Sequence, residues 1–300
     1  MRIFERIVDR MTHGICLNNI GTLYYRFGDY CRAIEYHKRA LKIMEEVGNV
    51  RGQANTFSNM GLLYDRLGDY PQAFDYYHRA LAINVKIGNR MNQGIALNNI
   101  GFAFYHLGDY PRAMDYLQRS LVIRKAIGNR RGEGITLNNI GMVFAELKDY
   151  EKSLACLIAA QKIGRELREK ENLLRVELSL GKLELALGHT ESSRHKAFGH
   201  AARALKLAGE MNLKSDRAQA LLLQARILST DSPFKKGGLK GDFNKYFKEA
   251  ISIFKGLKQP FDLARAYYYY AECSALKTRE SSSFRRDSGP TAPLGGTAAT

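Results

Sequence analysis

The sequence has no tryptophan, only four cysteines and six prolines, and no apolar run long enough to cross a membrane. The cysteines are scattered and lack CxxC spacing, which is typical of proteins from reducing compartments. The first residues, MRIFERIVDRM, carry charges where a signal peptide needs an apolar stretch. These absences argue against a disulfide scaffold, a membrane protein and a secreted protein, so we expect a cytoplasmic location.

Acidic residues are also scarce, with 30 Asp and Glu against 46 Lys and Arg, which gives a net charge of +16. Such an excess raises the question of nucleic acid binding. The charge is spread thinly, however, with net +6 over residues 1–160 and +10 over residues 161–300. No RNA-recognition signature, RGG run or zinc-finger spacing accompanies it. We therefore interpret it as basic solvated helix faces that suit an acidic protein partner. RNA binding by the repeat surface is the alternative, and it predicts a strong salt dependence.

The most informative pattern is a repeated pentapeptide. Leu-Asn-Asn-Ile-Gly begins at Leu17, Leu97 and Leu137, and a looser copy, FSNMG, begins at Phe57. The final glycines of these copies therefore stand 40 residues apart. Self-similarity at this period predicts a solenoid of stacked units, because each unit is too small to bury its own apolar face.

Residues 49–88 show how one unit is built. Asn49 can cap a first helix and Asp69 a second one, and Gly68 can adopt the left-handed conformation between them. Pro71 is tolerated in the first turn of the second helix, where its missing N–H had no partner. Buried stripes at helical spacing are expected at Phe57, Met60, Gly61 and Tyr64, and at Ala73, Tyr77, Ala80 and Leu81.

The repeated glycines have a packing interpretation. A glycine inside a helix costs about 0.5–1 kcal/mol relative to alanine, so its retention in four units indicates a close contact between two helices. We expect that contact at Gly21, Gly61, Gly101 and Gly141, with Ala33, Ala73 and Ala113 on the opposite side.

The spacing of Leu17, Gly21, Tyr24, Ala33 and Ala40 resembles the tetratricopeptide repeat (TPR), in a form longer than the common 34-residue repeat. Similar long repeats occur in kinesin light chain, in Pins-type adaptors and in bacterial TPR signalling proteins. The resemblance implies an all-α fold, a right-handed α-solenoid of stacked antiparallel helix pairs.

The repeat pattern also divides the chain. Residues 1–8 align with the end of a truncated preceding repeat, which indicates either a fragment of a longer protein or an end covered by another surface. The remaining divisions are four regular units at 9–168, two divergent units at 169–258 with an insertion at 232–242, a capping helix at 259–279 and a disordered tail at 280–300. The insertion is basic and rich in glycine, but it lacks the spacing of a phosphate-binding loop.

In this repeat family the first helices line the concave face. Advancing 100° per residue from the buried stripe of each first helix gives the positions that point away from it. These positions should form the floor of a groove, and they are Ile15, Asn19, Thr22 and Arg26; Asn55, Asn59, Leu62 and Arg66; Ile95, Asn99, Phe102 and His106; and Ile135, Asn139, Met142 and Glu146.

One asparagine per unit forms a ladder along this floor: Asn19, Asn59, Asn99 and Asn139. A carboxamide both donates and accepts hydrogen bonds, which suits the backbone of an extended peptide, and the resemblance implies this use. The other candidate peptide contacts are flanking Asn18, Asn98 and Asn138, nearby Tyr25 and Tyr105, and apolar Ile15, Leu62, Ile95, Phe102, Ile135 and Met142. Arg26 and Arg66 favour acidic residues in the ligand. Alternatively, the ladder bridges neighbouring first helices and fixes the superhelix.

The sequence shows no constellation for chemistry. Spacings of six and five residues do not place His189, His195 and His200 on one helix face, so a metal site there is a weaker interpretation than an exposed loop. The carboxylate clamp of cochaperone repeats needs Lys and Asn where this chain has Asn18 and Thr22, so the sequence argues against the capture of a C-terminal carboxylate by such a clamp. We therefore expect no catalytic residue, no metal and no cofactor, and we do not expect an enzyme.

These observations predict a scaffold that binds a protein or extended peptide segment, acidic in part and with apolar anchors. The alternative is the regulatory array of a larger signalling protein, such as a kinase, cyclase or transcription regulator, in which the groove binds an intramolecular segment. We expect neither membrane nor nucleic acid as a partner. The sequence does not specify an oligomeric state.

Overall fold

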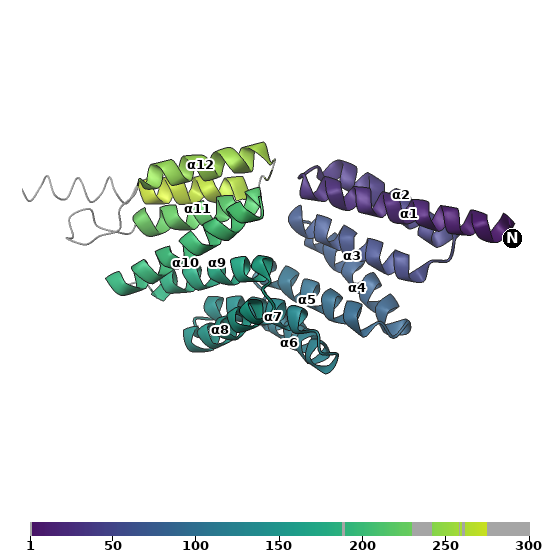
Figure 1. The fold of residues 1–300 in the computed structure, drawn as a ribbon, viewed down its shortest axis with the longest axis horizontal. Helices are drawn as coiled ribbons and strands as arrows, with labels where there is room; N and C mark the ends of the chain where they lie inside the picture. Colours follow the sequence, from purple (N-terminus) through teal and green to yellow (C-terminus); the bar gives the residue numbers. More distant parts are fainter. Residues whose placement is uncertain (1, 188–189, 230–241, 258, 260–261, 275–300) are drawn as a thin grey trace, which may run out of the picture.

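The structure is a computed structural model, and it describes residues 2–187, 190–229, 242–257, 259 and 262–274. Within these residues the chain forms helices and no strands (Figure 1). The helices with defined bounds are α1 (Arg2–Arg26), α2 (Tyr30–Glu46), α3 (Val50–Arg66), α4 (Tyr70–Lys86), α5 (Arg90–Leu107), α6 (Tyr110–Ala126), α7 (Arg130–Glu146), α8 (Tyr150–Glu166), α9 (Lys170–Leu187), α10 (Glu191–Glu210), α11 (Lys214–Ser229) and α12 (Phe243–Gly256). Residues 262–274 are helical as well.

The regular helices begin and end where the caps predict. The Asn49 side chain accepts a hydrogen bond from the Gly52 backbone N–H at the start of α3, and Asp69 does the same for Gln72 in α4. Gly68 has a φ of +75°, the left-handed conformation expected between the two helices. The two helices of each unit are therefore held in a fixed hairpin.

Close contact between paired helices occurs at the repeated glycines. A Cβ added at Gly101 would lie 2.8 Å from Leu117 Cγ and 3.1 Å from the Ala113 carbonyl oxygen of α6. At Gly141 the corresponding neighbours are Leu157 and the Ser153 carbonyl oxygen. The packing interpretation of these glycines is confirmed, because a side chain there would force the helices apart.

The helix pairs stack into a solenoid. Each helix packs on the next one in the chain, and each first helix also touches the first helix of the following unit, as in α5, α7 and α9. Second helices make no such contact with one another in the part of the chain that the structure describes. Elements on the inside of a curve are closer together, so the first helices form the inner, concave side of the arch in Figure 1. The predicted all-α solenoid of stacked antiparallel helix pairs is confirmed.

The two ends of this arch face each other (Figure 1). Gly28, in the turn between α1 and α2, lies against Leu257 at the end of α12, and a Cβ at Gly28 would collide with the Leu257 carbonyl oxygen. In the same region Tyr30 of α2 lies close to Gln259 and Asp262. The turn after α1 therefore contacts the end of α12, which brings the two ends of the stack together.

The start of the chain differs from the expectation. Residues 1–8 were expected to end a preceding repeat, but α1 runs without a break from Arg2 to Arg26. The other units have Gly48, Gly88 or Gly128 at the corresponding turn, whereas this position is Val8, so nothing ends the helix there. The expectation of a boundary at residue 9 is therefore wrong.

The later units follow the expected order with local departures. Lys148, Arg168 and Asn212 adopt positive φ at turns where earlier units use glycine. Helix α12 starts after Asp242, whose side chain accepts from the Asn244 backbone N–H. The expected capping helix corresponds to the helical residues 262–274. The body of the expected insertion and the tail at 280–300 lie outside the described residues.

Among the described residues, no helix combines the length and apolar character needed to cross a membrane.

Candidate functional site

Two asparagines of the ladder are bridged, which means hydrogen-bonded to the preceding unit, and two are open, which means without a hydrogen bond. The Asn59 carboxamide donates to Asn18 Oδ1 at 3.3 Å, and that of Asn139 donates to Asn98 Oδ1 at 3.1 Å. Asn19 and Asn99 form no hydrogen bond within the described residues, and both remain accessible. The bridging alternative therefore holds for Asn59 and Asn139, whereas Asn19 and Asn99 keep free carboxamides on the concave side.

A single replacement explains the open carboxamide of Asn99. The residue that should accept from it, in the place of Asn18 and Asn98, is Ser58. The Ser58 hydroxyl instead donates to the Ala54 carbonyl oxygen of its own helix at 3.0 Å. Because no acceptor reaches across from α3, the Asn99 side chain has hydrogen-bonding capacity left for a ligand.

The flanking asparagines serve the fold. Asn98 Oδ1 also accepts from the Thr136 hydroxyl at 3.1 Å, and Asn138 donates to Asn139 Oδ1 at 3.4 Å. Asn98, Asn138 and Asn139 are all buried. The structure thus contradicts the expectation that these three contact a partner, because their side chains are buried within the stack. Asn18 is half-buried and partly shielded by His37.

Apolar side chains flank the open asparagines. Ile15 is 43% exposed beside Asn19, and Ile95 is 37% exposed beside Asn99. Phe102 is half-buried and stacks on Tyr105 with ring centroids 5.6 Å apart. The remaining predicted anchors, Leu62, Ile135 and Met142, are also half-buried. An apolar strip of this kind is larger than expected for a surface that contacts only solvent.

Polar residues at the turn end of the groove link successive units. Arg66 donates to the Tyr25 hydroxyl at 3.2 Å, and the Tyr105 hydroxyl donates to Glu146 at 3.2 Å. Arg26, by contrast, is exposed.

Two of these groups have shifted pKa values. Proximity to Tyr25 raises the pKa of Arg66, against the opposing effect of burial. Burial, with a further contribution from Glu146, raises the pKa of Tyr105, so its hydroxyl remains a donor at neutral pH.

A cavity that the sequence did not indicate is lined by residues of α5, α7, α8 and α9. It has a volume of about 240 Å³, and Tyr105, Met142, Glu146 and Lys182 are among its lining residues. Lys182 occupies the position of Met142 one unit later, so the 40-residue period could have identified it. Arg226 and Arg265 lie close enough to Lys182 to influence its pKa. They come after the part of the chain that keeps the 40-residue period, so the period does not identify them.

A larger hollow, of about 520 Å³, lies between α4, α5 and α6 on the outer side of the stack. Its charged residues are already engaged, since Arg119 pairs with Asp115 at 3.3 Å and Arg90 donates to Gln93 at 3.3 Å. Its apolar wall includes the exposed Val122. With its charged groups engaged, this hollow offers less for recognition than the concave groove.

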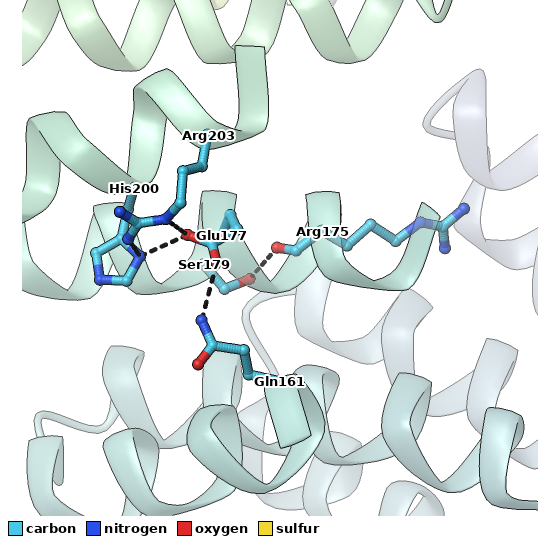
Figure 2. Close-up of polar contacts among 6 residues, drawn as sticks. All are labelled: Gln161, Arg175, Glu177, Ser179, His200 and Arg203. Atoms are coloured by element: carbon cyan, nitrogen blue, oxygen red, sulfur yellow. Dashed lines mark hydrogen bonds and ion pairs between the residues drawn. The ribbon is translucent and has the colours of Figure 1, made fainter. Parts of the chain in front are cut away.

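A polar network around the buried Glu177 carboxylate joins α8, α9 and α10 (Figure 2). The Glu177 carboxylate accepts from Gln161 at 2.8 Å, from His200 at 2.7 Å and from Arg203 at 2.8 Å. Glu177 stands where the earlier units have Leu97 and Leu137. Every side of the carboxylate is satisfied, so the network is a structural replacement for an apolar contact.

The histidine cluster gives no metal site in the described part of the chain. His200 belongs to the Glu177 network, and His195 Nδ1 is bonded to the Glu191 carbonyl oxygen at 2.9 Å. His189 lies outside the described residues. No group of three or more potential metal ligands occurs among those residues.

Comparison with known proteins bears on the repeat. Three segments match models of the tetratricopeptide repeat, at residues 15–47, 52–126 and 136–165. No curated protein sequence is similar enough to this chain to count as a relative.

Solved structures with a similar fold include regulators of the Rap type. The Rap conjugation gene regulator of plasmid pLS20, in complex with the Phr* peptide, is 14% identical with a TM-score of 0.66, over 89% of this chain and 76% of that one. A Rap protein complexed with competence and sporulation factor is 14% identical with a TM-score of 0.62, over 90% and 88%. The apo form of RapI is 17% identical with a TM-score of 0.58, over 90% and 99%. At these identities the likeness concerns the fold.

Proposed function

Because the chain is a tetratricopeptide-repeat protein, we propose that it is a cytoplasmic, non-catalytic scaffold that holds an extended peptide segment in its concave groove. The observation that carries this proposal is the free carboxamide of Asn99, which lies between Ile95 and Phe102 on the inner face. Asn19 and Ile15 repeat the arrangement two units earlier. A backbone-binding group beside an apolar anchor is what an extended peptide requires.

The energetic terms assign different roles to these residues. Each net hydrogen bond contributes about 0.5–1.5 kcal/mol, whereas association costs roughly 4–15 kcal/mol in lost freedom. Two open carboxamides cannot offset that cost, so apolar burial at about 25 cal/mol per Å² must supply most of the affinity. The ligand we propose therefore has hydrophobic side chains facing Ile95 and Phe102, with its backbone on Asn99.

The peptide complexes among the similar structures support the same use of the fold. One Rap protein was solved with competence and sporulation factor and another with the Phr* peptide. We propose a protein or peptide partner here as well, bound as a separate molecule. An intramolecular segment in the same groove would make the same contacts.

The experiment is affinity selection of random decapeptides with free carboxyl ends on the full-length chain, with Kd values of synthesised hits measured by fluorescence anisotropy. First helices spaced about 10 Å apart and an extended chain of about 3.3 Å per residue make this length sufficient for four units. Phe102→Ala should weaken binding at least tenfold, and Asn99→Ala about three- to tenfold, as expected for one or two lost hydrogen bonds.

Two control variants separate binding from structure. Ile158→Ala removes a similarly exposed apolar side chain from the outer helix α8 and should leave Kd unchanged. Asn139→Ala breaks the bond to Asn98 and should lower the free energy of unfolding by about 1 kcal/mol with little effect on Kd. Selection of no peptide, or equal binding by wild type and the Phe102→Ala, Asn99→Ala double variant, would disprove the groove function.

A further inference from the structure

Three cations from successive first helices lie near one another, where none was expected from the sequence. Lys182 on α9, Arg226 on α11 and Arg265 in the helical residues 262–274 come from three successive first helices, and we call them the inner basic cluster. Lys182 lines the cavity of about 240 Å³ together with Tyr105 and Met142. The cluster thus continues the floor on which Asn99 and Phe102 lie.

The acidic groups near this cluster already have partners. Asp262 forms an ion pair with Arg265, and Glu146 accepts a hydrogen bond from the Tyr105 hydroxyl. Lys182 forms no hydrogen bond or ion pair within the described residues. The Arg226 guanidinium lies 4.0 Å from the centroid of the Tyr269 ring, and it also has no ion pair there. Lys182 and Arg226 therefore have no anion in contact with them in the part of the chain that the structure describes.

The electrostatic state of Lys182 agrees with this geometry. Burial lowers its pKa to about 8, and the charges of Arg265 and Arg226 lower it further than Asp262 and Glu146 raise it. The Lys182 side chain is nevertheless accessible to solvent, since it lines the cavity together with Tyr105 and Met142. An anion entering here would relieve the repulsion between the three cations.

The charges near the cavity favour an anion. With Lys182 protonated, the three cations of the cluster outnumber the anions Asp262 and Glu146, and Lys148 lines the same cavity and adds a further positive charge. Since the ligand proposed for the groove is a peptide, the anion that it can bring to this site is a carboxylate.

We propose that the inner basic cluster binds a carboxylate of the peptide held in the groove, either an Asp or Glu side chain or the C-terminal carboxyl group. This inference rests on the proposed function. It adds which chemical group of the peptide is bound and in which direction the peptide lies in the groove. The site differs from the cochaperone clamp, whose residues are replaced by Asn18 and Thr22 in this chain. The carboxylate lies at the α9–α11 end, and the apolar anchors lie over α5.

The test uses the selected decapeptides resynthesised in four forms. The C-terminus is either a free acid or an amide, and the Asp and Glu residues are either kept or changed to Asn and Gln. Removal of the binding carboxylate should weaken binding to the wild-type chain about tenfold or more, the range of a charge-assisted hydrogen bond. The form that loses affinity identifies the source of the carboxylate.

Lys182→Met is the decisive variant. It should bind the acid and neutral forms with equal affinity, while Lys162→Met, which removes an exposed lysine from the outer helix α8, should keep the wild-type preference. The preference should also fade in the wild type as pH rises from 7 to 9.5, because Lys182 loses its proton, and Lys182→Met should show no such change. Circular dichroism of each variant checks that it is folded.

The outcomes distinguish this inference from the function on which it rests. Peptides that depend on Phe102 but bind equally well without any carboxylate would overturn the anion site and leave the groove function standing. A preference for acids that survives in Lys182→Met would also overturn it. Selection of no peptide at all would overturn both.

Discussion

The side chain that faces each repeated glycine changes from unit to unit. His37 packs on Gly21, Tyr77 on Gly61, and leucines fill the same place in the third and fourth units. His37 is almost fully buried, and its Nδ1 lies 2.8 Å from Asn18 Oδ1. A histidine in an otherwise apolar position makes the first unit sensitive to protonation.

We predict that His37 makes stability depend on pH. Burial lowers its pKa to about 4, whereas the unfolded chain titrates near pH 6.5. Between these values the unfolded state binds more protons, so stability should fall by up to about 3 kcal/mol as pH drops from 6.5 to 4. Urea unfolding at several pH values measures this.

His37→Leu is the matched variant, because Leu117 already fills this site against Gly101. It should remove the loss of stability between pH 6.5 and 5. If the variant and the wild type lose stability in parallel over that range, His37 is not the group responsible.

At the scale of the helix, the network around Glu177 fixes the register of α9 against its neighbours. Burial, the largest influence, raises the pKa of Glu177, but hydrogen bonds from His200 and Arg203 outweigh it and hold the pKa below its ordinary value. The carboxylate therefore stabilises the fold above the unfolded pKa of about 4.3, and this contribution is lost as pH falls through the folded value.

The prediction concerns Glu177→Leu, which restores the residue of the earlier units. The variant should be about as stable as the wild type at pH 7, since a buried charge network and an apolar contact of similar size are often equivalent. It should lose less stability than the wild type between pH 5 and 3 in thermal unfolding. Glu171→Gln, on an exposed turn of the same helix, should change stability by only about 0.5 kcal/mol. A Glu177→Leu chain with an unchanged acid transition would contradict this role.

The helices themselves were largely predictable from the sequence. Helix ends are set by local residues, the caps such as Asn49 and Asp69 and the turn glycines such as Gly68. Because these residues recur in each unit, the helix bounds recur with them. The boundary expected at residue 9 is absent because Val8 stands where the other units have their turn glycine.

The candidate site was less predictable, because it depends on contacts between units. Whether a ladder asparagine has a free carboxamide depends on the residue that faces it from the preceding unit, as Ser58 shows for Asn99. The inner basic cluster depends on curvature accumulated over several units, which no single repeat encodes.

At the scale of the whole molecule, the contact between Gly28 and Leu257 closes the arch. Gly28 has a φ of +79°, and any Cβ there would displace the Leu257 carbonyl oxygen. We predict that Gly28→Ala opens the arch and increases the radius of gyration measured by small-angle X-ray scattering.

Gly108→Ala provides the control for backbone strain. Gly108 has a similar φ of +83°, but no atom lies within 4 Å of its added Cβ. Both variants should lose about 1–2 kcal/mol for a left-handed alanine, and only Gly28→Ala should change the overall dimensions. Equal scattering from the two variants would show that the ends do not hold each other in solution.

The closure also restricts how a long partner can engage. The peptide proposed here follows the inner circumference from α5 towards α11, so it does not pass through the ring but bends along its wall. A free tail can adopt this curve after entering from either face of the ring. A segment between two folded domains can adopt it only when both of its flanks leave through the same face, so the closure should favour free tails over internal segments.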